Sequence, residues 1–222
     1  MSYSEIINTF GNSVYFVQGL IAVYGAFLVI LMLRRISRKR FANAASATQF
    51  LDEIRDRLNE RNVDGIIELC DSPAYWSKAV PQLILIALQN PHLSMAKLRR
   101  LLGETFEREV LAEFEFQTSW IATVVKSAPM LGLLGTVLGM IAAFEKIANV
   151  QQTGTDPSML AGDISYALIT TAVGLIIAIP LVLAGNMLHV RIGKLQDSVQ
   201  QYLGQFLEIY ENSPVRANQV VS

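Results

Sequence analysis

Three long stretches without a charged residue dominate the pattern of hydrophobic and polar positions along this chain. They extend over residues 6–33, 127–144 and 164–188. A helix of about 20 apolar residues crosses the roughly 30 Å of hydrocarbon in a membrane. Each stretch reaches or approaches that length. The pattern therefore predicts three transmembrane helices, which we place at 13–33, 127–144 and 164–188.

The remaining polar segments show the periodicity of surface helices. Phe50, Ile54 and Leu58 recur every four residues with charged residues between them, which predicts an amphipathic helix. Ser94 is a candidate N-cap for a further helix that has no stop signal before the second span, so this helix is expected to run from about 94 to 146. Helical spacing also continues beyond the third span, and the final "NSPVRANQVVS" is expected to be disordered.

Composition supports a membrane protein. Of the 222 residues, 52% are hydrophobic and only 17% are charged, and the mean hydropathy is +0.37. These values are unusual for a soluble domain. The net charge of −1 argues against binding of nucleic acid through a basic surface, and the single cysteine excludes an internal disulfide framework.

The basic residues predict the orientation of the spans. No Lys or Arg precedes Arg34, whereas fourteen of the eighteen lie between Arg34 and Lys126, beginning with "RRISRKR". Basic loops stay on the cytoplasmic side of a membrane. The expected organisation around the three spans is therefore an outer N-terminal segment (1–12), a cytoplasmic helical region (34–126), an outer loop (145–163), and a cytoplasmic helix and tail (189–222).

Small and hydroxyl residues follow one face of each of the last two spans, and small residues let helices approach closely in a membrane. They are Gly132, Gly135, Thr136, Gly139 and Ala143, followed by Ala167, Thr171, Gly174 and Ala178. In one interpretation these faces pack the two helices together, with threonine hydroxyls bonded to their own backbone. In the other they line a central space, which requires self-association because three helices cannot enclose a lumen. Thr170 points about 100° away from Thr171 and is expected to pack between protomers.

No pattern of enzymatic chemistry is present. The sequence contains no phosphate-binding glycine loop, no spacing of zinc ligands and no nucleophile elbow. Its two histidines, His92 and His189, are far apart in the chain. We therefore expect a protein that is not an enzyme and that has no organic cofactor or bound metal.

Two segments of the last two spans, "APMLGLLGTVLGMIAAF" and "ALITTAVGLIIAIPLVLAGN", together strongly resemble the MotA/TolQ/ExbB family, and most closely its ExbB and TolQ branches. The resemblance extends more loosely to the whole layout. It implies an all-α integral membrane protein of the bacterial inner membrane with a periplasmic N-terminus. Its three transmembrane helices, with long cytoplasmic helical extensions, would assemble as a homopentamer around a central pore.

The resemblance also implies a function. Such a pentamer surrounds the transmembrane helices of two copies of a partner resembling ExbD or TolR. Each of these helices has an aspartate inside the membrane. Flow of H⁺ drives motion of that partner, which performs work on a TonB- or TolA-like protein in TonB-dependent transport or a Tol-type system. Use of Na⁺ is less favoured. The alternatives are a non-conducting homo-oligomeric scaffold and an Na⁺-driven or gliding-type motor of the same family.

Site residues carry over from the family one by one. Its pore threonines fall on Thr136 and Thr171, its third-span proline on Pro180, and the asparagine at the inner end of that span on Asn186. A threonine hydroxyl can donate to an ionised aspartate or accept from a protonated one, which suits a carboxylate that moves.

The chain departs from the family pattern at one position. The ExbB and TolQ branches usually have a glutamate five residues before the third-span threonine, and this chain has Tyr166 there. Three explanations remain open. The Tyr166 hydroxyl replaces the carboxyl, Asp163 takes its place at the outer mouth of the pore, or the glutamate is dispensable and the partner's aspartate is the only titrating group. We favour the third.

Overall fold

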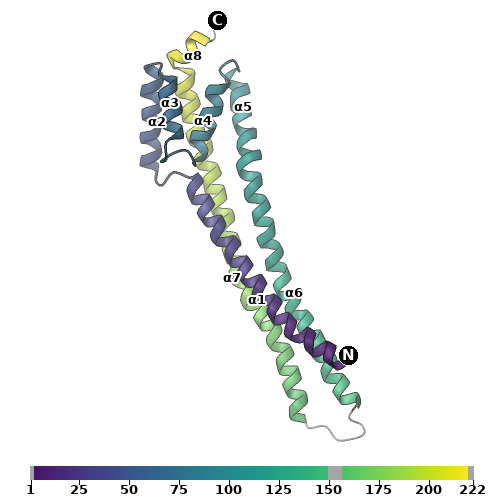
Figure 1. Cartoon of the computed structure of the whole chain (residues 1–222). Coiled ribbons are helices and arrows are strands. Elements are labelled where there is room, and N and C mark those ends of the chain that lie inside the picture. The colour runs from purple at the N-terminus through teal and green to yellow at the C-terminus, as the bar shows by residue number, and fades with distance from the viewer. Residues whose placement is uncertain (1–2, 150–156, 220–222) are drawn as a thin grey trace. The chain divides into compact units, whose positions relative to one another are not determined.

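The computed structural model describes the backbone of residues 3–149 and 157–219. Side chains are described from 13 to 216, apart from 146, 148–160 and 163. Every regular element in these ranges is helical (Figure 1), which confirms the predicted all-α fold.

The helices follow one another along the chain with short connections. They are α1 (Tyr3–Lys39), α2 (Ala44–Asn59), α3 (Val63–Asp71), α4 (Ala79–Gln89), α5 (Met95–Phe106), α6 (Ala112–Asn149), α7 (Pro157–Glu211) and α8 (Pro214–Gln219). A π-helical turn, Glu107–Leu111, joins α5 to α6. The chain is thus helical from Met95 to Asn149, which confirms the long helix expected after Ser94.

Three of the helical runs are long and apolar enough to cross a membrane, as predicted: those that contain α1, α6 and α7. At 1.5 Å per residue the 55 residues of α7 extend over about 80 Å, well beyond the thickness of the hydrocarbon layer. Within the expected outer loop over 145–163, α6 continues to Asn149 and α7 begins at Pro157, and residues 150–156 lie outside the described residues.

The chain divides into two compact units. The first, called here the span unit, comprises Met1–Leu31 and Gln117–Met187. The second, called the polar unit, comprises Met32–Phe116 and Leu188–Ser222. Each of the three long helices contributes one part to each unit. The span unit therefore contains all but the inner ends of the uncharged stretches, and the polar unit contains α2 to α5 and most of the charged residues.

The polar unit has its own aromatic core. Phe50, Ile54 and Leu58 of α2 are fully buried, as their spacing predicts. The Phe50 ring packs against the rings of Tyr75 and Phe41, with centroids 4.6 and 5.5 Å apart. Complete burial of such side chains contributes about 1.5–3 kcal/mol each, so this core is a main source of stability within the polar unit.

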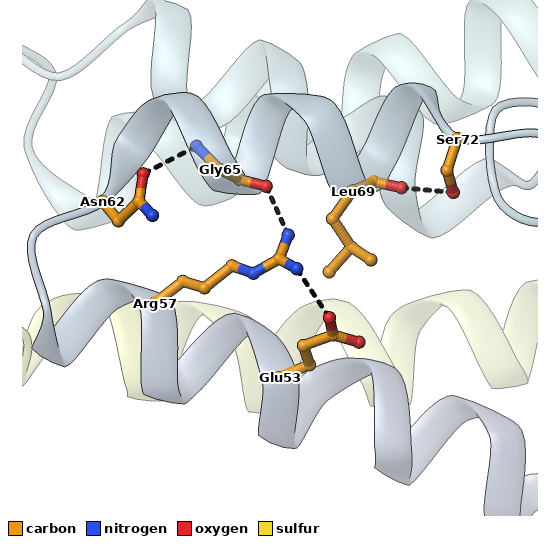
Figure 2. Close-up of polar contacts among 6 residues, drawn as sticks. All are labelled: Glu53, Arg57, Asn62, Gly65, Leu69 and Ser72. Atoms are coloured by element: carbon orange, nitrogen blue, oxygen red, sulfur yellow. Dashed lines mark hydrogen bonds and ion pairs between the residues drawn. The ribbon is translucent and has the colours of Figure 1, made fainter.

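A network of hydrogen bonds fixes the turn between α2 and α3 (Figure 2). Arg57 donates to Glu53 at 2.7 Å and also to the Gly65 carbonyl. The Asn62 side chain accepts from the Gly65 N–H at 2.8 Å and thereby caps the first turn of α3. Arg61 has a φ of 56°. The turn thus depends on side chains at both ends, which charge patterning alone does not reveal.

The predicted disorder of the C-terminal segment is wrong for its described part. Pro214 begins α8, and Arg216 is only 7% exposed. The guanidinium of Arg216 donates to the carbonyls of Pro91 and Leu93, in the connection between α4 and α5. These bonds order a segment whose composition alone is typical of a free tail.

Candidate ion pathway between α6 and α7

Glycines of α6 bring its backbone close to that of α7 within one chain. A Cβ placed on Gly132 would lie 2.8 Å from Thr171 Cα and 2.9 Å from the Thr170 carbonyl oxygen. One placed on Gly139 would lie 2.5 Å from Ala167 Cβ. Such distances leave no room for a methyl group. The small-residue faces therefore pack α6 against α7, as the first of the two interpretations predicts.

Gly135 and Gly174 complete this contact. A Cβ on Gly135 would lie 2.7 Å from Thr170 Cβ, and one on Gly174 would lie 2.6 Å from the Ala128 carbonyl oxygen. Close packing of this kind is the main force between helices in lipid, where burial of apolar surface brings no gain. Four of the predicted packing residues are thus at the contact itself.

Thr136 and Thr171 lie at the edge of the same contact. Their hydroxyl oxygens are 3.2 Å apart, and either can be the donor. Thr136 Oγ1 also lies 2.8 Å from the Leu133 carbonyl oxygen. Both residues are half-buried in the single chain. Because each hydroxyl has one proton and two acceptor sites, the pair keeps acceptor capacity that a neighbouring donor can use.

The adjacent Thr170 has a different environment. It is 1% exposed, and its hydroxyl lies 2.6 Å from the Ala167 carbonyl and 3.1 Å from the Gly132 carbonyl. The expectation that Thr170 packs between protomers is therefore wrong. The hydroxyl lies inside one chain because the glycines of α6 leave it a place and a carbonyl acceptor.

Tyr166 and Asp163 precede Thr170 and Thr171 on α7 by at least one helical turn. Tyr166 is 42% exposed, and its ring makes an edge-on contact with the Tyr15 ring at 5.1 Å between centroids. The Asp163 backbone belongs to α7, but its side chain lies outside the described residues. The structure thus brings Tyr166 to α1 rather than to the threonine pair.

Pro180 and Asn186 are both exposed on α7. Pro180 lies inside the helix and cannot donate to the carbonyl one turn earlier. For Pro180 and Asn186 the described structure records no contact to Thr136 or Thr171, so their proposed packing role stays a prediction.

Gln18 of α1 is a further residue at this site, and it is not among the residues predicted from the sequence. This side chain is fully buried, and its Nε2 donates to the Thr170 carbonyl at 3.0 Å. Its Oε1 has no hydrogen-bond partner among the described residues. One signal was available: Gln18 is the only amide side chain in "VYFVQGLIAVYGAFLVILML", and a polar residue inside a span is expected to have a function or a partner.

Within the described side chains, no group of three or more His, Cys, Asp or Glu residues is placed to hold a metal ion. The polar groups at the level of the threonine pair are hydroxyls, one amide and backbone carbonyls. These groups can pass hydrogen bonds to a mobile acid or base, but none of the side chains among them titrates near neutral pH.

Comparison with known proteins identifies relatives of this chain. The model of the MotA/TolQ/ExbB proton channel family matches residues 76–201. The Tol-Pal system protein TolQ of Haemophilus influenzae is 34% identical over 110 residues, 50% of this chain and 47% of that protein. An ExbB homolog of Methanothermobacter thermautotrophicus is 27% identical over 188 residues, 81% of this chain and 63% of that protein.

A third relative is the biopolymer transport protein ExbB of Neisseria gonorrhoeae, which is 37% identical over 82 residues, 36% of each chain. This chain spans less than two thirds of the length of each of these relatives. The family match covers more than half of the chain and includes the parts of α6 and α7 that form the glycine contact. On these grounds the chain belongs to the MotA/TolQ/ExbB proton channel family.

Proposed function

We propose that this protein is the channel-forming energiser subunit of an inner-membrane motor. Five copies would surround a pore lined by α6 and α7, with the N-terminus in the periplasm and the C-terminus in the cytoplasm. The proton-motive force would move a single-span partner, similar to ExbD or TolR, inside that pore. Membership of the family supports this proposal, together with relatives named for Tol-Pal function and biopolymer transport.

The observation that carries the proposal is the hydroxyl pair of Thr136 and Thr171. The two hydroxyl oxygens are 3.2 Å apart, both residues are half-buried, and they belong to stretches of the sequence, 127–144 and 164–188, without a charged residue. Five such pairs would give the partner's aspartate equivalent, weak hydrogen bonds in every orientation. Each proton that crosses 100 mV releases about 2.3 kcal/mol. Weak bonds of about 1 kcal/mol can be broken by such a step.

The partner's aspartate is proposed as the titrating group, which leaves Tyr166 as an aromatic residue that contacts α1. A role for Asp163 at the outer mouth of the pore is the alternative within the same proposal. H⁺ is the proposed coupling ion. The TonB-dependent and Tol-type systems are both candidates for the work performed, since relatives named for biopolymer transport and for the Tol-Pal system both match the chain.

The rival proposal is a passive scaffold, in which the glycine contact only holds helices together. Thr136→Val and Thr171→Val separate the two, because valine keeps the shape of threonine and removes its hydroxyl. Each variant would be purified with a co-expressed single-span protein similar to ExbD or TolR, and the stoichiometry measured by native mass spectrometry. Proton flux into proteoliposomes and rescue of a deletion strain would report function. Growth under iron limitation and resistance to detergent would distinguish a TonB-type from a Tol-type role.

Thr123→Val is the matched control, since Thr123 is exposed on α6 and its hydroxyl donates only to the Ser119 carbonyl one turn earlier. The proposal expects complexes of unchanged stoichiometry in all three variants, with proton flux and rescue lost in Thr136→Val and Thr171→Val alone. Full activity in both would reject the role of the hydroxyl pair and favour the scaffold.

A further inference from the structure

The first span contributes two hydrogen bonds to the backbone of α7. The Tyr15 hydroxyl donates to the Tyr166 carbonyl at 3.2 Å, and Gln18 Nε2 donates to the Thr170 carbonyl at 3.0 Å. Residues three apart lie on one face of a helix, as do residues four apart. The donors of α1 thus meet carbonyls on two successive turns of α7.

The Gln18 contact depends on close packing. Gly174 lies beside the amide, and a Cβ there would be 3.3 Å from Gln18 Nε2. The amide is fully buried, yet its Oε1 has no partner among the described residues. An unpaired acceptor away from water lowers stability. A leucine or methionine would avoid this cost, so the donating end of Gln18 is the part that requires an explanation.

The residue that Gln18 holds is tied to both neighbouring helices. The Thr170 carbonyl accepts from α1, and its hydroxyl lies 3.1 Å from the Gly132 carbonyl of α6. Thr171 follows directly, with its hydroxyl oxygen 3.2 Å from that of Thr136. Successive residues point about 100° apart around a helix. A modest rotation of α7 would therefore separate the two hydroxyls.

We propose that Tyr15 and Gln18 form a clamp that fixes the rotation of α7 and thereby sets the hydroxyl pair of Thr136 and Thr171. They are positioning residues, since neither contacts the pair directly. The first span is then part of the ion-handling machinery. This inference rests on the proposed function of the pair, but the position of the two hydroxyls can be measured without any assay of function.

The test uses the full chain with its single-span partner and three clamp variants. Gln18→Met removes the amide donor and keeps an unbranched chain of similar length. Gln18→Glu keeps a donor, because burial in the membrane favours the protonated carboxyl. Tyr15→Phe removes one hydroxyl and keeps the ring. Tyr24→Phe is the matched control, since Tyr24 is a more exposed tyrosine of the same helix.

Position is read from the rate of disulfide formation between Thr136→Cys and Thr171→Cys, in a chain with Cys70→Ala. If the clamp exists, Gln18→Met slows this rate about tenfold, because loss of one hydrogen bond changes the population of the clamped position by about that factor. Tyr15→Phe slows it as well, whereas Gln18→Glu and Tyr24→Phe leave it near the parent rate. Proton flux, measured with both threonines present, follows the same order at unchanged stoichiometry.

The outcomes test the clamp and the function of the hydroxyl pair separately. An unchanged crosslinking rate in Gln18→Met and Tyr15→Phe overturns the clamp. Loss of crosslinking together with full activity of Thr136→Val and Thr171→Val supports the clamp and rejects the function of the pair. Loss of flux in Thr136→Val and Thr171→Val, with crosslinking at the parent rate in Gln18→Met and Tyr15→Phe, rejects the clamp and supports the function of the pair. If Gln18→Met does not assemble, Tyr15→Phe and Gln18→Glu decide by the same rate.

Discussion

Gly135→Ala tests how tightly α6 and α7 are packed. The new methyl group would lie 2.7 Å from Thr170 Cβ and 3.1 Å from Thr170 Cγ2. Thr170 cannot turn away at no cost, because it is buried and its hydroxyl is shared between the Ala167 and Gly132 carbonyls. The chain must therefore separate the helices or break a hydrogen bond.

The expected magnitude follows from three contributions. Overpacking a close contact costs about 1–3 kcal/mol, and loss of the bond from Thr170 to Gly132 costs about 1 kcal/mol more. The higher helix propensity of alanine offsets up to about 1 kcal/mol of this cost, because glycine is the poorer helix former. Gly135→Ala should thus lower the free energy of unfolding by about 1–3 kcal/mol. Gly132→Ala should cost more, since its methyl group would meet the Thr171 backbone at 2.8 Å.

The assay is unfolding in mixed micelles with a rising fraction of SDS, followed by circular dichroism and tryptophan fluorescence. Gly19→Ala is the matched control, because a Cβ on this span glycine would meet nothing within 4 Å. It should leave stability unchanged or raise it slightly. If Gly135→Ala and Gly132→Ala unfold at the same SDS fraction as Gly19→Ala, the close contact between α6 and α7 does not exist as described.

Two further predictions concern the polar unit. Arg216→Ala should destabilise this unit by about 2 kcal/mol or more, because it leaves the carbonyls of Pro91 and Leu93 without a charged donor. Thermal unfolding would measure this loss of stability. Arg100→Ala is the control and should change stability little, since Arg100 and its partner are both exposed. Burial raises the pKa of the Cys70 thiol from 9.0 to about 12, so maleimide should label it at pH 8 only after unfolding. Rapid labelling of the native protein would contradict its buried position, and the contribution of this thiol to stability should be lost as the pH rises from about 9 toward 12.

The sequence predicts the helices well where a residue acts through its own neighbours. Phe50, Ile54 and Leu58 define a buried face by spacing alone, and Ser94 caps the helix it precedes by accepting from the Lys97 N–H. The π-helical turn at Glu107–Leu111 has no such marker, since neither glycine nor proline interrupts the helix there. A wide turn of this kind leaves no pattern in residue type.

Contacts between distant segments are where prediction from the sequence fails. Arg216 orders the C-terminal segment through carbonyls more than 120 residues earlier in the chain. Gln18 similarly acts on the Thr170 carbonyl, 152 residues away. Backbone carbonyls are present at every position, so the residue type does not indicate which carbonyl is the acceptor. Only the donor is visible in the sequence, and its partner emerges with the fold.

The adjacent threonines of α7 show how one small-residue face can serve both packing and chemistry. Thr170 points into the contact with α6 and satisfies its hydroxyl on backbone carbonyls, so its role is accounted for by packing. Thr171 is turned toward the edge, where it is half-buried and pairs with Thr136. The glycines that admit Thr170 therefore also determine how closely the hydroxyls of Thr136 and Thr171 approach. Packing within one chain is consequently compatible with the proposed pore between several chains, because the contact leaves the hydroxyl pair half-buried at its edge.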